Sequence, residues 1–458
     1  MKEVKLEEAA YQFEAKMSLR QAIPLGLQHV CAMFVGNLTP LLIITSACGI
    51  AGGEFADLQV TLLQSAMFVA GIVTLVQLFT IGPVGGAVPI IMGTSSGFIG
   101  VFNSVVGTMG GGVLAYGAIM GASIIGGIFE SVLGFFLKPL RRFFPPVVTG
   151  PIIISIGLIL APSAITNCQS NWLLAFVALG TVIVCNIWGK GMVKILPILI
   201  GVLVSYAVAL VTGAVDFQKI SEAAWLGIPL HKEAMGLFAI DGSPEFISAL
   251  FTIIPIALAT MMEHVGDIAA ISATVGHNYI NDPGLNRTLM GDGLATTMAG
   301  LLGGPANTTY GENTGVLALS KIYDPLVIRI AAVLAIILSF SPKFEAVINT
   351  IPTGIIGGIS FVLYGMISAI GVRNVVENRV DFTNSRNLIV AAVILVCALG
   401  FNSVGGVGFT VGSVTINLSG LAVAAIAGIL LNAILPGNDY EFDATAGSDA
   451  ATSGNLQV

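Results

Sequence analysis

Apolar runs long enough to cross a membrane follow one another along almost the whole chain. A helix of about 20 apolar residues spans the bilayer hydrocarbon, and the pattern predicts about fourteen such segments. They are 21–45, 59–81, 84–104, 113–137, 146–161, 172–188, 196–213, 244–272, 289–303, 306–322, 324–341, 344–369, 387–402 and 417–436. Several are too short or too interrupted to cross as plain helices. We therefore expect an all-α polytopic membrane protein whose interrupted segments form a buried site.

The clearest interruption is the polar stretch 304–315, GPANTTYGENTG. A proline, three glycines and a run of Asn and Thr oppose a continuous helix, which predicts an extended piece over 306–310 and a half-helix starting near Glu312. Bilayer hydrocarbon excludes irregular backbone unless protein or a cavity surrounds it. The stretch therefore predicts a site near the membrane midplane, where the N–H groups that begin the half-helix face a ligand.

The two halves of the chain resemble each other. Residues 27–30 (LQHV) in the first segment are similar to 262–265 (MEHV) in the eighth, and 93–100 (GTSSGFIG) in the third are similar to the stretch 304–315 in the tenth. Both matches lie seven segments apart, and an odd number of crossings gives the two halves opposite orientations. Interruptions at corresponding places of inverted repeats indicate a binding site. The third segment is therefore expected to contain an extended piece and a half-helix too.

Composition supports this class and excludes others. Only 9% of the residues are charged, against roughly 25% in soluble domains. The net charge of −7 provides no basic face, so nucleic acid is not an expected partner. The five cysteines lack metal-ligand spacing, and the glycine-rich loops do not lead into a phosphate-binding pattern. Neither a metal nor a cofactor is expected.

Basic residues predict the orientation in the membrane. With a cytoplasmic N-terminus, only Lys219, Lys232 and Lys343 fall outside, whereas cytoplasmic loops are expected to collect the Lys and Arg residues. The cytoplasmic side then carries Lys138, Arg141, Arg142, Lys190, Lys194, Arg287, Lys321, Arg373, Arg379 and Arg386. No cleavable signal peptide is visible, so the first segment is expected to remain in the mature protein. The pattern predicts a multi-pass protein of the plasma membrane, the inner membrane in a Gram-negative bacterium, with both termini cytoplasmic.

Acidic residues inside the apolar segments are the main functional candidates. Glu263, Asp267 and Glu312 lie in apolar surroundings, where ionisable groups are costly enough to suggest a function. Glu263 and Asp267 are four residues apart and share a helix face, so at least one is expected to hold a proton near neutral pH. Such a site is able to couple a proton to a substrate. The alternative is that these acids only fix helix packing, which is the role we expect for Glu130 and Asp292.

Two histidines and two aromatic residues lie beside these acids. His29 and His264 fit either interhelical hydrogen bonding or proton transfer, and the sequence leaves both open. Phe98 and Tyr310 lie in the two interrupted segments, where they are placed to stack on a planar ligand. Backbone N–H groups suit carbonyl oxygens, and carboxylates accept from ring N–H groups. A flat ring alternating C=O and N–H matches this set, and both uracil and xanthine present such an edge.

The segment 307–321 resembles the signature of the nucleobase–ascorbate transporter family, and its Tyr-Gly-Glu-Asn form is similar to the uracil permease branch. Further similarities are found at Gln28-His29, at 263–266, at 363–365, at 371–373 and at Asp381. The resemblance covers nearly the whole chain. It implies fourteen spans in two inverted seven-span repeats, with short β-strands and half-helices in spans 3 and 10. It also implies proton-coupled nucleobase transport in a homodimer.

The resemblance further implies a core domain that moves against a gate domain. Their expected bounds are a cytoplasmic tail 1–20, core 21–137 (spans 1–4), gate 138–243 (spans 5–7), core 244–341 (spans 8–11), gate 342–437 (spans 12–14) and a cytoplasmic tail 438–458. By motif position, Glu263 and Glu312 bind the ring, with backbone contacts from Tyr310, Gly311 and Ser96. Tyr364 lies on the gate side, and Asp267 occupies the proton-coupling position.

Three positions bear on the substrate. Uracil permeases usually carry histidine where this chain has Asp267, and phenylalanine is common where it has Ser96. Xanthine and urate transporters tend to carry aspartate at the first position, but purine carriers usually have glutamine in place of Glu312. We therefore expect a uracil:proton symporter, with a xanthine or purine:cation symporter as the alternative.

Other functional classes fit less well. The chain has no HExxH motif and no Gly-x-Ser-x-Gly elbow, which disfavours an intramembrane hydrolase. A channel does not require paired acids facing two broken helices. An anion exchanger of similar architecture is a more distant alternative, because such proteins commonly carry a large C-terminal domain and because the expected site carries acids where an anion favours bases.

Overall fold

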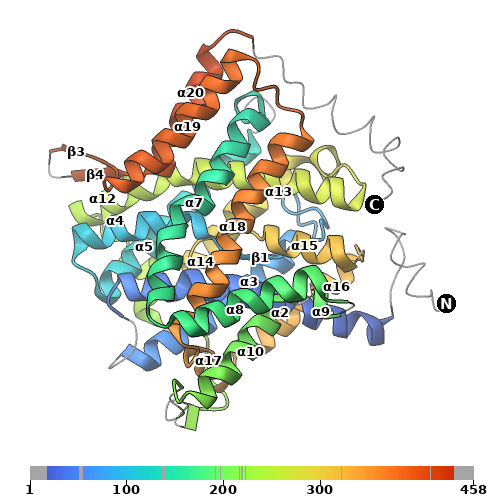
Figure 1. The fold of residues 1–458 in the computed structure, drawn as a ribbon. Coiled ribbons are helices and arrows are strands. Elements are labelled where there is room, and N and C mark those ends of the chain that lie inside the picture. Colours follow the sequence, from blue (N-terminus) through green and yellow to red (C-terminus); the bar gives the residue numbers. More distant parts are fainter. Residues whose placement is uncertain are drawn as a thin grey trace.

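The computed structural model describes residues 18–437 apart from 51–54, 137–140, 191, 196, 216, 218, 219, 222, 321 and 413. A few side chains within helices, including that of Glu312, are also outside the description. The described chain is mainly helical (Figure 1). Six of its helices are long and apolar enough to cross a membrane, or seven if the bent pair of α16 (Pro325–Ser339) and α17 (Pro342–Asn349) counts as one span. The chain is a multi-pass membrane protein, as its hydropathy predicts.

The elements follow the predicted segments in two sets of seven. The first set is α2 (Leu19–Ala47), α3 (Ala56–Leu78), β1 (Met92–Thr94) with η2 (Ser96–Phe98) and α4 (Ile99–Met109), α5 (Gly112–Phe135), α7 (Pro146–Gln169), α8 (Trp172–Trp188) and α10 (Pro197–Val211). The second set is α12 (Pro244–Ile253) with α13 (Ala257–Val275), α14 (Leu285–Leu302), β2 (Asn307–Thr309) with α15 (Gly311–Ser320), α16 (Pro325–Ser339), α18 (Thr353–Glu377), α19 (Ser385–Ser403) and α20 (Gly420–Ile434).

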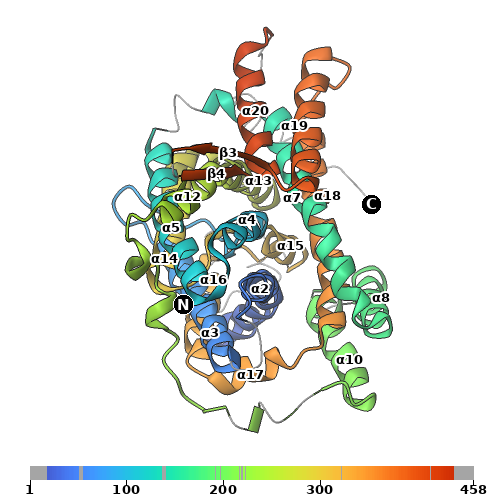
Figure 2. The same ribbon diagram turned by 90° about the vertical axis from the view of Figure 1, so that its left-hand side faces the viewer.

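Helices of one set pack against helices of the other, and the pairs correspond between the two repeats, as inverted repeats require. α14, the ninth element, packs along α5, the fourth, and α3, the second, packs along α16, the eleventh. α8 packs along α10 in the first set, and their counterparts α19 and α20 pack along each other in the second. α7 packs along its own counterpart, α18. Figure 2 shows α2 nearly end-on, with α7 and α18 together to one side of it and α8 and α10 beyond them. The predicted all-α fold of two inverted repeats is confirmed.

The interrupted segments also fold as expected. β2 falls within the predicted extended piece 306–310, and α15 begins at Gly311. In the third segment, β1 is followed by the single turn η2 and then by α4. Pro305 and the glycines on either side of each strand oppose a helix there, so each segment crosses only part of the membrane as a helix.

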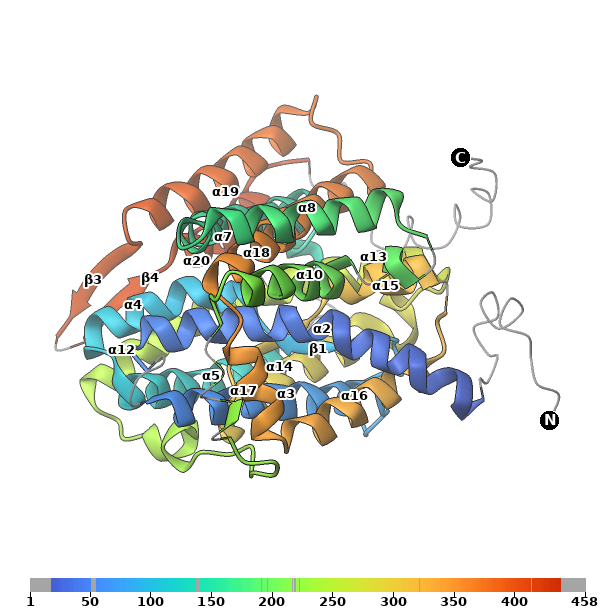
Figure 3. The same ribbon diagram turned by 60° about the horizontal axis from the view of Figure 1, so that its bottom comes forward.

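Two elements differ from the hydropathy pattern. The predicted segment 344–369 is two helices: α17 (Pro342–Asn349) bends away from α16 by 94°, and α18 begins only after Pro352. Prolines open both helices, and each removes a backbone N–H from a continuous helix. The second element is an antiparallel hairpin of β3 (Val407–Val411) and β4 (Val414–Leu418). Figure 3 shows it at the opposite end of the helices from the start of α2.

Each of the strands β1 and β2 is hydrogen-bonded to a threonine of the preceding helix. The Thr74 hydroxyl accepts from the Met92 N–H at 2.9 Å and lies 3.4 Å from the Met92 carbonyl oxygen. In the second repeat the Thr296 hydroxyl donates to the Asn307 carbonyl at 2.7 Å and accepts from the Asn307 N–H at 3.3 Å. In each repeat, a threonine hydroxyl therefore bonds to the backbone N–H and C=O groups at one end of the strand.

We expect Thr296→Val to lower the apparent melting temperature of the purified protein, because it leaves the Asn307 N–H and C=O buried without this partner. An unpaired buried polar group costs about 1–3 kcal/mol. Thr212→Val is the matched control, since the exposed Thr212 hydroxyl bonds only to carbonyls of its own helix. Equal melting temperatures for Thr296→Val and the wild type would show that the hydroxyl does not support the strand.

Candidate functional site

The two short strands meet as an antiparallel pair inside the protein. Met92 pairs with Thr309, Gly93 with Thr308 and Thr94 with Asn307. The pairing extends on both sides, where the Ser95 N–H donates to Ala306 at 2.8 Å and the Tyr310 N–H donates to Ile91 at 2.9 Å. The helical turns that open the two half-helices follow directly, at Ser96 and at Gly311. Backbone N–H groups that begin a helix have no intrahelical partner, so both half-helices present donors beside the strands.

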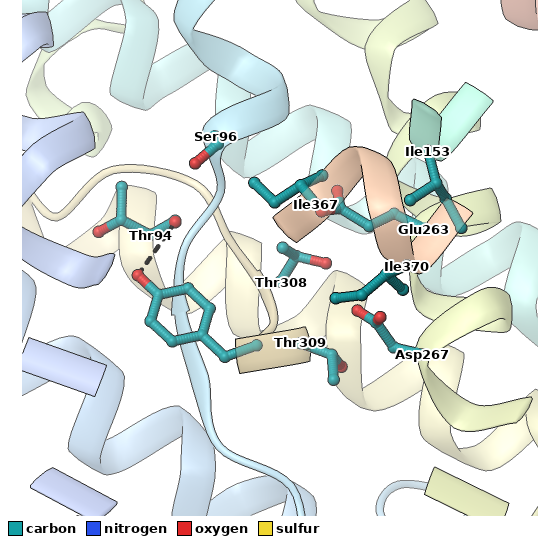
Figure 4. A pocket seen from close by; sticks show the side chains of 11 residues that line it. Thr94, Ser96, Ile153, Glu263, Asp267, Thr308, Thr309, Ile367 and Ile370 are labelled. Carbon is teal, nitrogen blue, oxygen red and sulfur yellow. Dashed lines mark hydrogen bonds between the residues drawn. The ribbon is translucent and has the colours of Figure 1, made fainter. Parts of the chain in front are cut away.

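The Tyr310 ring fixes the geometry of the strand pair. Its hydroxyl donates to the Thr94 carbonyl at 3.2 Å (Figure 4) and lies 3.4 Å from Asn37 Oδ1. Asn37, on α2, accepts from the Thr94 N–H at 2.9 Å and from the Thr94 hydroxyl at 2.8 Å. The ring covers Gly93 so closely that a Cβ atom at that position would overlap it. Gly93 is therefore required for this approach.

A pocket lies between the strands and the helices α7, α13 and α18 (Figure 4). It brings together five of the predicted site residues: Ser96, Glu263, Asp267, Tyr310 and Gly311. Thr94, Thr308 and Thr309 complete the strand side. The opposite wall consists of isoleucines that the sequence analysis missed, namely Ile153 of α7 and Ile367 and Ile370 of α18. Apolar residues in apolar helices carry no local signal of such a role.

The pocket is almost closed. Its volume is about 20 Å³, which is room for roughly one water molecule. A planar ring does not fit this volume. The three isoleucines belong to the helices α7 and α18, which lie beside the strands.

Two carboxylates face the starts of the two half-helices. Glu263 and Asp267 lie one turn apart on α13 and are 8% and 4% exposed. An ideal Cβ atom at Gly97 lies 3.8 Å from Glu263 Oε2, and one at Gly311 lies 3.1 Å from Asp267 Oδ1. Each acid therefore approaches the N-terminal end of a different half-helix.

A cluster of buried polar side chains around His264 and Asp292 contacts β2. The His264 Nδ1 atom lies 2.9 Å from the Thr309 hydroxyl and 3.5 Å from Asp292 Oδ1. The Thr308 hydroxyl donates to Asp292 Oδ2 at 3.3 Å. Glu130, fully buried on α5, faces Asp292. These contacts join α5, α13 and α14 to the strand, which agrees with the packing role expected for Glu130 and Asp292.

Four predicted site residues are not placed in the pocket. Phe98 is buried against Phe102, with ring centroids 6.3 Å apart, while Tyr364 of α18 and His29 of α2 are buried without lining it. The backbone of Glu312 follows Gly311 at the start of α15, but its side chain lies outside the described part of the structure. The roles expected for these four residues remain predictions.

Asp381, which contributed to the family resemblance, has a local role between α18 and α19. Its Oδ1 atom accepts from the Thr383 N–H at 2.8 Å and from the Thr383 hydroxyl at 2.7 Å. These hydrogen bonds lower the pKa of the Asp381 carboxyl below its usual value. The residue stabilises the turn and lies away from the pocket.

Comparison with known proteins identifies the family. A model of the permease family matches residues 20–405. The chain belongs to this family. It is the nucleobase–ascorbate transporter family that the signature resembles, so that prediction is confirmed. The chain is 36% identical over 431 residues to a uracil permease of Bacillus subtilis (strain 168), covering 90% of this chain and 92% of that protein.

Another relative carries a different name. A putative purine permease of Clostridium perfringens (strain 13 / Type A) is 33% identical over 440 residues, covering 93% of this chain and 92% of that protein. Among solved structures, the transmembrane domain of a cyanobacterium bicarbonate transporter has a TM-score of 0.58 at 16% identity. It covers 86% of this chain and 99% of that domain, and it shares the fold of two inverted seven-span repeats.

We expect Gly93→Ala to lower the apparent melting temperature, because the added methyl group overlaps the Tyr310 ring and must displace it from Asn37 and Thr94. Gly107→Ala on α4 is the matched control, since nothing lies within 4 Å of its added Cβ atom. A Gly93→Ala protein as stable as Gly107→Ala would contradict the close approach of the ring.

Proposed function

We propose that this protein is a proton-coupled nucleobase importer, with uracil as its main substrate. The observation that carries the proposal is the pocket in which Glu263 and Asp267 face the starts of the two half-helices across the strand pair. Membership of the permease family and similarity to a uracil permease support it. Transport changes the position of the base and leaves its covalent structure intact, so we propose no enzymatic activity.

The donors and acceptors of the pocket suit a flat heterocycle. We assign the backbone N–H groups at Ser96 and Gly311 to ring carbonyl oxygens and the Glu263 carboxylate to a ring N–H. We assign Glu312 to a second ring N–H and Tyr310 to a backbone contact and to holding β1. A uracil-like edge alternates C=O and N–H groups that these partners complement. Phe98 is buried at the end of the turn η2 that begins with Ser96.

Proton coupling follows from the carboxylates. Two ionised acids one helical turn apart repel each other when they are buried. Asp267 is the residue we assign to proton coupling, with Glu263 as its partner. His29 is a further candidate that lies outside the pocket. The neutral base then moves together with a proton in this proposal, and the transmembrane gradient drives its accumulation.

Alternating access requires the pocket wall to move. We propose that α2–α5 and α12–α16 form the core and that α7–α10 and α18–α20 form the gate, within the bounds predicted from the sequence. Ile153, Ile367 and Ile370 then belong to the gate and close the pocket against the core strands. Tyr364, on α18, lies on the gate side. We also propose cytoplasmic termini, from the distribution of Lys and Arg, and a homodimer in the plasma membrane.

A purine substrate is the second candidate. Asp267 and Ser96 both line the pocket, and these are the two positions where the chain departs from the uracil branch. The relative named as a putative purine permease favours the same alternative. An anion exchanger is less favoured, because the pocket lining contains two acids and no basic residue.

Uptake of radiolabelled uracil into proteoliposomes tests the function. We expect an inward proton gradient to stimulate uptake, with uracil analogues competing and xanthine, hypoxanthine and urate competing weakly. Stimulated uptake in which xanthine competes strongly would assign the protein to the purine carriers instead. Absence of nucleobase uptake by correctly folded protein would overturn the proposal.

We expect Glu263→Gln to reduce uracil uptake roughly 10- to 100-fold, since a hydrogen bond to a charged group contributes about 1.5–3 kcal/mol. Glu245→Gln, at an exposed position on α12, is the matched control and should transport normally. Uptake by Glu263→Gln equal to that of Glu245→Gln would remove Glu263 from the site.

Glu312→Gln tests selectivity. We expect weaker uracil uptake and unchanged or stronger competition by xanthine, because glutamine replaces an acceptor-only side chain with one that also donates. The measurement is the ratio of uracil uptake with and without xanthine. Unchanged uracil uptake at wild-type expression would show that Glu312 does not bind the ring.

A further inference from the structure

A second cavity adjoins the pocket. It has a volume of about 250 Å³, against about 20 Å³ for the pocket itself, and shares Asp267, Gly311 and Ile370 with it. The larger volume approaches the lower end of small-molecule binding sites, roughly 300 Å³. In this structure, a cavity of suitable size for a single ring therefore lies next to the closed pocket.

The cavity lies toward one face of the membrane. Its walls come from the C-terminal parts of α13 and α18 and from the half-helix α15. Because successive spans alternate in direction, these parts lie on the same face as the start of α2, which is the cytoplasmic face in the proposed orientation. The cavity thus lies on the path by which an imported base leaves the pocket.

The chemistry of the cavity suits a flat, polar-edged ring. Met366, Ala369 and Ile370 supply an apolar wall, while Asp267 and Arg373 are the charged groups in the lining. A carboxylate accepts from a ring N–H, and the planar guanidinium donates to carbonyl oxygens. The Arg373 Nε atom bonds to Glu377 Oε1 at 2.5 Å, which leaves the two terminal nitrogens for a ligand. The side chain is 46% exposed, so it is accessible from the aqueous side.

We infer that this cavity is a second nucleobase site, occupied when the base has left the central pocket and before it reaches the cytoplasm. The inference rests on the proposed nucleobase transport. Asp267 belongs to both sites, so the base is able to exchange one set of partners for the other without losing every hydrogen bond. Arg373 is then a binding residue of the inner site and has no contact with the central pocket.

Initial rates of uracil transport into inside-out and right-side-out membrane vesicles test the inference. Ala369→Leu fills the cavity without touching the central pocket, and Arg373→Gln removes the guanidinium. We expect both variants to raise KM at least fivefold in inside-out vesicles, where uracil enters from the cytoplasmic face, and to change KM less than twofold in right-side-out vesicles.

Two controls separate binding from structural effects. Ala392→Leu adds the same bulk at an exposed position of α19, and Glu377→Gln breaks the ion pair while leaving the guanidinium in place. Both should keep the wild-type KM in both vesicle types. Wild-type KM values for Ala369→Leu and Arg373→Gln in inside-out vesicles, or equal increases on both sides, would overturn the inner site. Failure of the wild type to transport uracil would instead overturn the proposed function.

Discussion

An extended backbone survives inside a membrane protein only where its N–H and C=O groups find partners within the protein. The antiparallel pairing of β1 with β2 satisfies this requirement for both interrupted segments at once. Thr74, Thr296 and Asn37 satisfy groups at the strand ends. The pairing also explains why both repeats must be present, because each strand is the other's partner. It fixes the positions from which the two half-helices begin, and the site follows from those positions.

The role that we propose for the acids of α13 depends on this arrangement. Glu263 and Asp267 lie one turn apart, and each approaches the start of one half-helix. The N-terminal ends of two half-helices thus meet the two carboxyl groups of α13 in a pocket with little room for water. A group that adds or loses a proton there changes the charge balance of the whole pocket. That balance is the physical basis we propose for coupling a proton to a neutral base. We also propose that the isoleucine wall of α7 and α18 moves to admit the base.

Much of this was accessible from the sequence. The interruptions at 93–100 and 304–315 indicated both strands and both half-helices, because glycine, proline and polar residues are conspicuous in apolar surroundings. The same contrast indicated Glu263 and Asp267. The wall of Ile153, Ile367 and Ile370 gave no signal, since isoleucine in an apolar helix has the same appearance whether it faces a pocket, another helix or lipid. The bend between α16 and α17 and the β3–β4 hairpin were also missed, because hydropathy averaged over a span conceals where a helix turns.

Proton movement during uracil transport tests the proposed coupling through the acids of α13. Proteoliposomes with no imposed gradient and a pH-sensitive dye inside would receive external uracil. We expect the interior to acidify as uracil enters, and Glu263→Gln to reduce both signals roughly 10- to 100-fold. Entry of uracil with no change of internal pH would contradict proton coupling through the acids of α13.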